Sequence, residues 1–130
     1  MNQNRKNIST GAKWEDIVGY SRAVVIGNQI EVSGTVALDD QGKTVGMNNA
    51  YLQTKRILEI IQNTLNKAGA SMEDVVRTRI YVTDISLWEE VGKAHGEIFG
   101  KIKPATSMVE VSRLISDDYL VEIEAIAVIA

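Results

Sequence analysis

Few side chains of this sequence could carry out nucleophilic or metal-assisted chemistry. The chain contains no cysteine and a single histidine, His95, so thiolate catalysis is excluded and a metal site has little support. Ser33 has no recognisable His–Asp partner that would activate its hydroxyl, and we expect a turn or backbone contact beside Gly34 instead. His95 is expected to be a solvated helix residue. We expect neither a metal nor any other cofactor.

Glu122 is the best remaining candidate for acid–base chemistry. It lies in an alternating run near the C-terminus, on the same strand face as Glu124. The opposite face of this run is apolar and suits contact with helices: Val121, Ile123, Ala125, Ala127 and Ile129. A carboxylate at such a position can orient a water molecule or exchange a proton with a substrate. The alternative is a structural ion pair across the sheet face, with Arg77, Arg79 or Arg113.

The periodicity of the sequence predicts the elements that would position these residues. Strands are expected at 23–26, 29–33, 75–82, 106–111 and 119–129, with an extra short strand at 34–37. Helices are expected at 51–68, ending at Gly69, and at 86–99. Residues 1–19 are interpreted as a tail and lead-in, with Trp14 as an anchor. This order predicts an α+β domain with both helices on one face of the sheet.

Size and composition restrict the classes of function. A chain of 130 residues with 45% hydrophobic content predicts a single domain over 1–130. The formal net charge is −3 and no basic stripe is present, so no nucleic-acid partner is expected. We expect no secretory signal, and no apolar run is long enough to span a membrane. Together with the lack of cysteine, this predicts a cytoplasmic protein.

The sheet face turned away from the helices is expected to mix charged and apolar side chains. Ile126 and Val128 share this face with Glu122 and Glu124. Packing against other copies of the chain would cover the apolar groups. An ordinary half-solvated sheet face is the alternative.

An ordered set of short motifs resembles the RidA/YjgF family of small imine deaminases, some of whose members are labelled endoribonuclease L-PSP. The motifs extend from about residue 19 to residue 128, and none is specific alone. They are Gly19-Tyr20-Ser21, Gly27-Asn28, Ser33-Gly34, Ala68-Gly69, Asp74-Val75-Val76, Val82-Thr83-Asp84, Pro104 to Val111, Arg113-Leu114 and Glu122-Ile123-Glu124-Ala125. The resemblance implies a chorismate-mutase-like fold with a mixed sheet. It also implies a homotrimer with a barrel-like centre and small-molecule clefts at the subunit interfaces.

The resemblance also assigns residues to a substrate site. Tyr20, Ser33, Gly34 and Glu122 match family positions that shape the pocket or place the attacking water. Thr106 stands where deaminating members have an arginine that holds the substrate carboxylate through a bidentate pair. Nearby substrate-binding and helix positions are also altered: Met108 replaces a frequent cysteine, and Gly92 replaces an asparagine found in some members.

Thr106 leaves two functions in competition. The first is deamination of imines or enamines, with altered or lost activity toward 2-imino acids. The second is a non-catalytic metabolite binder or sensor on the same scaffold. Some relatives are labelled as endoribonucleases or translation inhibitors. Of the three functions, this one agrees least with the acidic charge of the chain. A further hypothesis is that Arg22 or Arg79 replaces the missing arginine, although Glu31, Glu110 and Glu124 offer both of them ordinary ion-pair partners.

Overall fold

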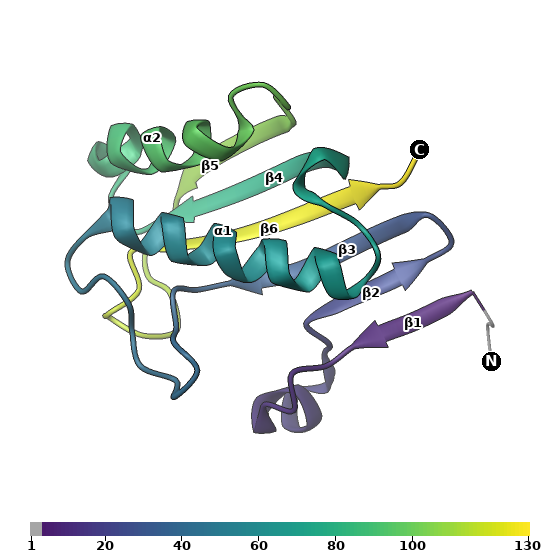
Figure 1. Ribbon diagram of the computed structural model, residues 1–130. Coiled ribbons are helices and arrows are strands. Elements are labelled where there is room, and N and C mark those ends of the chain that lie inside the picture. Colours follow the sequence, from purple (N-terminus) through teal and green to yellow (C-terminus); the bar gives the residue numbers. More distant parts are fainter. Residues whose placement is uncertain (1–3) are drawn as a thin grey trace.

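Six strands form one mixed sheet in the computed structural model, which describes residues 4–130 (Figure 1). The strand order is β1-β2-β3-β6-β4-β5, and all neighbours are antiparallel except β4 and β5. The strands are β1 (Arg5–Ile8), β2 (Ala23–Ile26), β3 (Gln29–Thr35), β4 (Val75–Val82), β5 (Ala105–Glu110) and β6 (Val121–Val128). The helices are α1 (Ala50–Lys67) and α2 (Trp88–Phe99), with short helical turns η1 (Glu15–Gly19), η2 (Met72–Asp74) and η3 (Ile85–Leu87).

Local sequence signals account for most element boundaries. The β2–β3 hairpin turns at Gly27, whose φ of 57° favours glycine. The Asn49 side chain caps α1 by accepting a hydrogen bond from the Leu52 backbone N–H at 2.9 Å. Gly69, with a φ of 86°, follows the end of the same helix. The predicted hairpin, both helices and the strands that follow them are therefore confirmed within a few residues.

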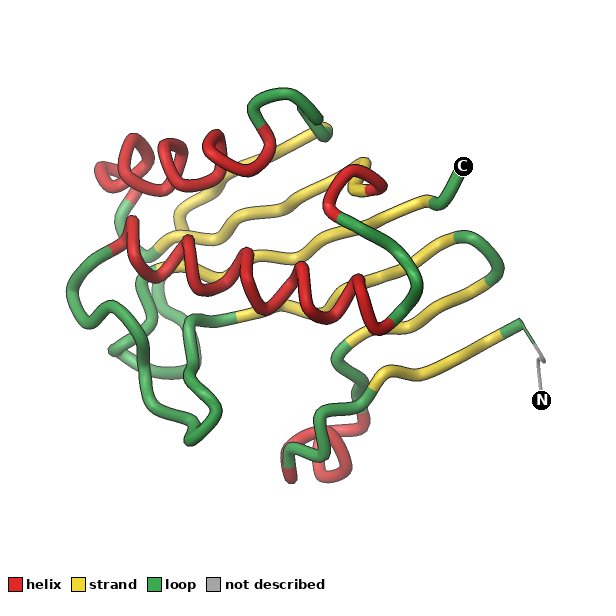
Figure 2. The backbone as a smooth tube through the Cα atoms, in the orientation of Figure 1, coloured by secondary structure: helices red, strands yellow, loops and turns green. Residues whose placement is uncertain are grey.

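Both helices lie on one face of the sheet, as predicted (Figure 2). Helix α1 contacts β3 and β6, and it also contacts α2. The side chains of β6 alternate as expected, so Val121, Ile123 and Ala125 are buried while Glu122 and Glu124 are half-buried on the opposite face. The apolar stripe of α1 supplies much of the remaining core: Ile57, Leu58, Ile61 and Leu65. No helix within residues 4–130 has the length and apolar character that crossing a bilayer requires.

The N-terminal segment differs from the sequence prediction. Residues interpreted as a tail include β1, which pairs with β2 at one edge of the sheet, and η1 follows it. Only Ile8 of β1 is buried, so this short strand carries too little apolar alternation to be recognised. Trp14 is 55% exposed and is not an anchor in this chain. The short strand predicted at 34–37 is instead an extension of β3 to Thr35.

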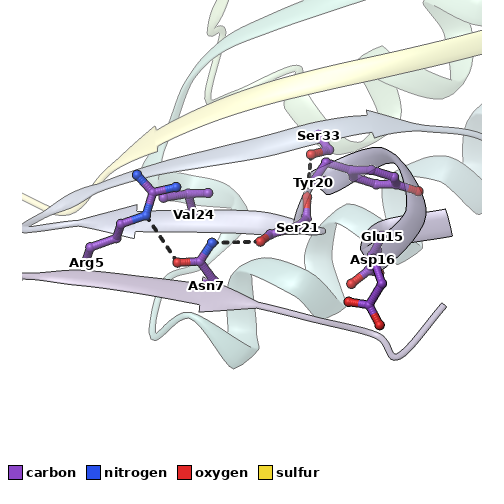
Figure 3. Close-up of a pocket in the computed structure, with 9 residues that line it drawn as sticks. Arg5, Asn7, Glu15, Asp16, Tyr20, Ser21, Val24 and Ser33 are labelled. Atoms are coloured by element: carbon purple, nitrogen blue, oxygen red, sulfur yellow. Dashed lines mark hydrogen bonds between the residues drawn. The ribbon is translucent and has the colours of Figure 1, made fainter. Parts of the chain in front are cut away.

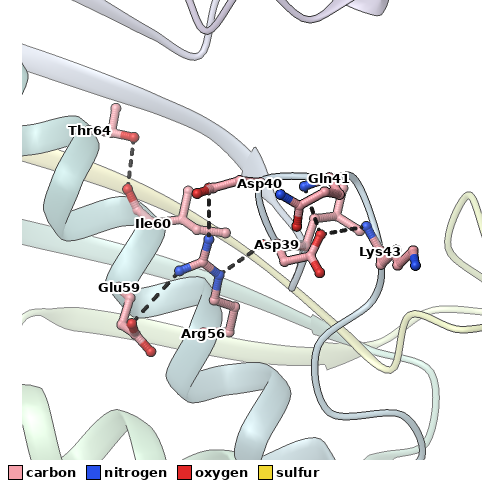
Figure 4. A network of polar contacts seen from close by, with 9 residues as sticks. Asp39, Asp40, Gln41, Lys43, Arg56, Glu59, Ile60 and Thr64 are labelled. Atoms are coloured by element: carbon pink, nitrogen blue, oxygen red, sulfur yellow. Dashed lines mark hydrogen bonds and ion pairs between the residues drawn. The ribbon is translucent and has the colours of Figure 1, made fainter.

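Two polar side chains of α1 fasten the long loops at one end of the sheet. Gln53 is fully buried, and its Nε2 donates to the carbonyl oxygens of Gly46 and Asp118 while its Oε1 accepts from the Leu120 N–H at 2.9 Å. Arg56 donates to the Leu38 carbonyl oxygen at 2.8 Å and forms an ion pair with Asp40 (Figure 4). The loop before α1 and the loop before β6 are thus both held to this helix.

Replacement of Gln53 by leucine tests this clamp. The substitution keeps the volume but leaves three backbone groups without their partner, so we expect unfolding to become easier by about 2–4 kcal/mol. Urea unfolding checks the value, with Gln62→Leu on the exposed face of the same helix as control. A loss no larger than that of the control would contradict the clamp.

Candidate functional site

A β-bulge in β3 forms the base of the candidate site. The register between β3 and β6 runs through Val32–Ala125 and Thr35–Ile123, so Ser33 and Gly34 together oppose one residue of β6. The Ser33 hydroxyl donates to the Ser21 carbonyl oxygen at 2.6 Å. This backbone contact confirms the structural role expected for Ser33 and fixes the bulge against the segment before β2.

The carboxyl group of Glu122 lies directly over Gly34. A Cβ at position 34 would collide with Glu122 Oε2 and would lie 3.0 Å from Glu122 Cδ. Only glycine leaves room for the carboxyl group here. Burial raises the pKa of Glu122, the neighbouring Glu124 raises it further, and Arg22 acts in the opposite direction. A carboxyl group with a raised pKa exchanges protons more readily near neutral pH, as a general acid or base requires.

Arg22 lies on the other side of the same bulge. Its Nη2 donates to the Gly34 carbonyl oxygen at 2.5 Å, and its buried Nε has no hydrogen-bond partner among the described residues. Burial lowers the pKa of Arg22, while Tyr20, Glu15 and Glu122 act in the opposite direction. The sequence-predicted residues Arg22, Gly34 and Glu122 thus come together on the face away from the helices.

A hollow of about 490 Å³ opens between β1, η1 and the bulge (Figure 3). Tyr20 and Ser33 line it, and Tyr20 is 39% exposed. Asn7 donates to the Ser21 hydroxyl at 2.8 Å on the floor of the hollow. Glu15 accepts from the Ser9 and Thr10 hydroxyls and holds η1 in place. The hollow is polar, so it can accept a small hydrogen-bonding molecule beside the bulge.

Thr106 and Met108 lie away from this group within one chain. Both are on β5, at the opposite edge of the sheet, and β5 is four strand positions from β2. A spacing of about 4.8 Å per strand separates the two strands by roughly 19 Å. Met108 packs against the core on the helix side, and Thr106 pairs in register with the fully buried Thr78. One chain therefore does not form a pocket from all the residues assigned by resemblance.

Thr106 belongs to a hydrogen-bonded chain that ends at His95. Thr78 Oγ1 lies 2.8 Å from Thr106 Oγ1 and 2.9 Å from His95 Nε2, and Thr106 Oγ1 lies 3.1 Å from the Pro104 carbonyl oxygen. The expectation that His95 is a solvated helix residue is therefore wrong. Its ring lies between α2 and the sheet, where burial lowers its pKa and favours the neutral imidazole.

The hydroxyl proton of Thr106 is donated within this row of hydrogen bonds in either orientation of the hydroxyl groups. If Thr78 donates to Thr106, the Thr106 hydroxyl donates to the Pro104 carbonyl oxygen. If Thr106 donates to Thr78, the same proton is used there. In both cases Thr106 offers only acceptor lone pairs to an outside molecule, which is the opposite of what an arginine offers.

The remaining charged groups of the outer face have other partners. Glu124 accepts from the Tyr81 hydroxyl at 2.9 Å, Glu31 accepts from Gln29, and Glu110 accepts from the Ile85 N–H. None of them forms the ion pair with Arg22 or Arg79 that the sequence suggested; the ion pairs among residues 4–130 both involve Arg56. Arg79 is exposed and lines a second hollow, of about 240 Å³. Across residues 4–130, no cluster of three metal-ligating side chains occurs.

Comparison with known proteins assigns the chain to a family. The family model described as Endoribonuclease L-PSP matches residues 10–129. A RutC family protein of Pyrococcus abyssi is 41% identical over 108 residues, covering 83% of this chain and 84% of that protein. The chain belongs to the YjgF/RidA family. The fold class inferred from sequence, an α+β sheet with two helices on one face, is the fold of this family.

Two solved structures support the assignment to the YjgF/RidA family. A YjgF family member from Mycobacterium tuberculosis is 50% identical, with a TM-score of 0.87 over 96% of this chain and 99% of that one. A Rid family protein of unknown function from Yersinia pestis is 33% identical, with a TM-score of 0.85 over 96% and 99% of the two chains. The similarity therefore extends over nearly all of both molecules.

Sequence reasoning missed the contribution of the N-terminal segment and of Thr78. Arg5 and Asn7 of β1 line the larger hollow, but the polar character of β1 made it resemble a tail. Thr78 lies on the core-facing side of β4. A threonine among valines and isoleucines there gives no sign that it joins His95 to Thr106. The only signal in the sequence was a hydroxyl residue at a position where the strand pattern calls for an apolar side chain.

The pH dependence of stability tests the environment of Glu122. A raised folded-state pKa means that its contribution to stability is complete at low pH and is lost as the pH rises through that pKa. Glu122→Gln removes this titration. We expect the unfolding free energy of the native chain, minus that of the variant, to fall as the pH rises above the ordinary glutamate pKa of 4.5. Urea unfolding at each pH measures this difference, and the same slope for the exposed control Glu73→Gln would contradict it.

Proposed function

We propose that this chain hydrolyses the imine or enamine of a small oxo compound, releasing the oxo compound and ammonia. The main support is the Glu122 carboxyl group, half-buried over Gly34 with a raised pKa, near a polar hollow lined by Tyr20 and Ser33. Membership of the YjgF/RidA family makes this chemistry plausible. Activity on 2-imino acids is expected to differ from that of family members with an arginine at this position, because Thr106 provides no cation on β5.

The proposed chemistry needs one group that moves a proton twice. Glu122 takes a proton from water as the water oxygen bonds to the imine carbon. Glu122 passes this proton to the nitrogen, which gives a carbinolamine. It then moves the hydroxyl proton to the nitrogen in the same way, so that the carbon–nitrogen bond breaks and ammonia leaves as the carbonyl forms. Removal of a positioned general base typically costs about 10²–10⁴-fold in rate. No redox cofactor is needed for this hydrolysis, since no electrons are transferred.

We further propose that the working form is a homotrimer with the small-molecule cleft at each subunit interface. Tyr20 and Glu122 lie on one part of the sheet, and Thr106 and Met108 lie on its far edge, so a pocket containing all four requires a second copy. Large apolar side chains are also exposed for an interface, including Val76 (46%) and Val109 (48%). Sedimentation equilibrium should give about three times the chain mass of 14.3 kDa.

A non-catalytic metabolite binder is the second candidate. It is favoured by Thr106, whose hydroxyl proton is used internally and which therefore cannot donate to a carboxylate. Endoribonuclease activity, named in the family description, fits least, because the net charge is −3 and the one histidine is half-buried beneath α2. A nucleic-acid partner is not part of the proposal.

The deciding experiment measures clearance of 2-iminopropanoate and 2-iminobutanoate generated in situ. The native chain should accelerate clearance over buffer, and Glu122→Gln should lose about 10²-fold or more of that acceleration. Thr106→Arg is assayed in parallel, and Glu73→Gln serves as an exposed carboxyl control.

Two results would contradict hydrolysis by the native chain. An inactive native chain with an active Thr106→Arg variant would support the binder instead, with a scaffold that is competent but a different natural ligand. Inactivity of both chains would argue against imine hydrolysis on this scaffold.

A further inference from the structure

Strand β5 forms one edge of the sheet, and the side chains that it presents there suit an anion poorly. Thr106 is exposed and Met108 is half-buried, and both lie on the helix side of the strand. The single charged residue of β5 is Glu110, which is negative. The lysines of the preceding turn, Lys101 and Lys103, are exposed, so water and salt weaken their attraction. A negative ligand beside Thr106 would therefore gain little from charge.

The hydroxyl group of Thr106 is an acceptor whose orientation is fixed by its neighbours. Its oxygen lies 2.8 Å from Thr78 Oγ1, and His95 Nε2 lies 2.9 Å from the same Thr78 oxygen. If the imidazole nitrogen accepts from Thr78, then Thr106 donates to Thr78 and keeps both of its lone pairs. If the nitrogen carries a proton, Thr78 donates to Thr106, which donates to the Pro104 carbonyl oxygen and keeps one lone pair. A lone pair of Thr106 is thus free in both states of His95.

We infer that Thr106 accepts a hydrogen bond from an N–H group of the ligand, so that the site selects neutral 2-oxo amides and their imines over the corresponding acids. The inference rests on the part of the proposed function that places Thr106 in the small-molecule cleft. An amide N–H points a donor at the free lone pair, whereas a carboxylate has only acceptor oxygens and would face the lone pair directly. A site that hydrogen-bonds an N–H group discriminates against analogues without one, because its acceptor is then left unpaired.

The next residue on the same strand face, Met108, supports a neutral ligand. Its thioether packs against the core and offers a flexible apolar surface rather than a donor. Residues two apart on one strand are separated by about 7 Å, a distance that a small oxo amide can bridge. The apolar end of such a ligand can therefore contact Met108 while its N–H group is bonded to Thr106.

The test compares three ligands of similar size by ligand-observed NMR titration: pyruvamide, methyl pyruvate and pyruvate. Pyruvamide carries an N–H donor, pyruvate carries a negative charge, and methyl pyruvate carries neither. We expect the native chain to bind pyruvamide about 2–10-fold more tightly than methyl pyruvate, the range for one neutral hydrogen bond. Pyruvate should bind the most weakly of the three.

Substitutions at Thr106 assign this preference to the hydroxyl group. Thr106→Val keeps the shape of the side chain but removes the acceptor, so it should weaken pyruvamide binding about 2–10-fold and change methyl pyruvate binding less than about twofold. Thr106→Ser keeps the hydroxyl group and should retain the preference for pyruvamide. Thr106→Arg should reverse it in favour of pyruvate. Thr44→Val, in the loop before α1, is the matched control and should leave all three affinities unchanged.

Several results would overturn the inference. They are tighter binding of pyruvate than of pyruvamide by the native chain, equal affinities for pyruvamide and methyl pyruvate, and no binding of pyruvamide at all. A preference for pyruvamide that persists in Thr106→Val would also overturn it. Equal losses of both neutral ligands in that variant would show a structural effect of the valine in place of a lost hydrogen bond, with the same consequence.

The binding result is separate from the imine-clearance result because none of the three ligands is an imine. Pyruvamide binding that depends on Thr106, without clearance of imines, would uphold the acceptor site and reject hydrolysis. Clearance together with pyruvamide binding that is insensitive to Thr106 would uphold hydrolysis and reject the acceptor site.

Discussion

The contact between the Glu122 carboxyl group and Gly34 constrains the surrounding structure. It requires a residue without a side chain at the bulge, and it requires β3 and β6 to pair in one register. Slippage by one residue would turn Glu122 toward the helices, where a carboxylate has no partner. Gln53 protects that register from the other side, because it holds the Leu120 backbone just before β6 begins. The site is therefore anchored by a buried amide on the opposite face of the sheet.

The architecture was predictable wherever one element carried its own signal. The stripe from Thr54 to Leu65 identified α1, and Gly27-Asn28 identified the β2–β3 hairpin. Strand β1 was not predictable, since three of its four residues are exposed and its pairing depends on β2. Glu122 and Glu124 were predicted to share the outer face of the last strand, and both lie there. The closeness of Glu122 to Gly34 was not predictable, because it depends on pairing between segments nearly ninety residues apart.

The His95–Thr78–Thr106 chain shows how a single position can change the character of a site. From the sequence alone, Thr106 is only expected to stand where deaminating members of the family have an arginine. The structure shows that the threonine hydroxyl is part of a partly buried polar network that reaches α2. Such networks are stable when every member is satisfied, and here each hydroxyl has a partner. Thr106 is therefore integrated into the packing of the domain, and a guanidinium group lies on the opposite part of the sheet, at Arg22.

The position of β6 has a consequence for synthesis of the chain. This strand is the last in the sequence, yet it lies between β3 and β4 in the middle of the sheet. The sheet cannot close while the ribosome still covers the C-terminal residues, so a nascent chain carries two unpaired strand edges until translation ends. Folding must then pair residues that are far apart in sequence, which slows it. A chain that terminates early would lack its central strand, and such products are prone to aggregate or to be degraded.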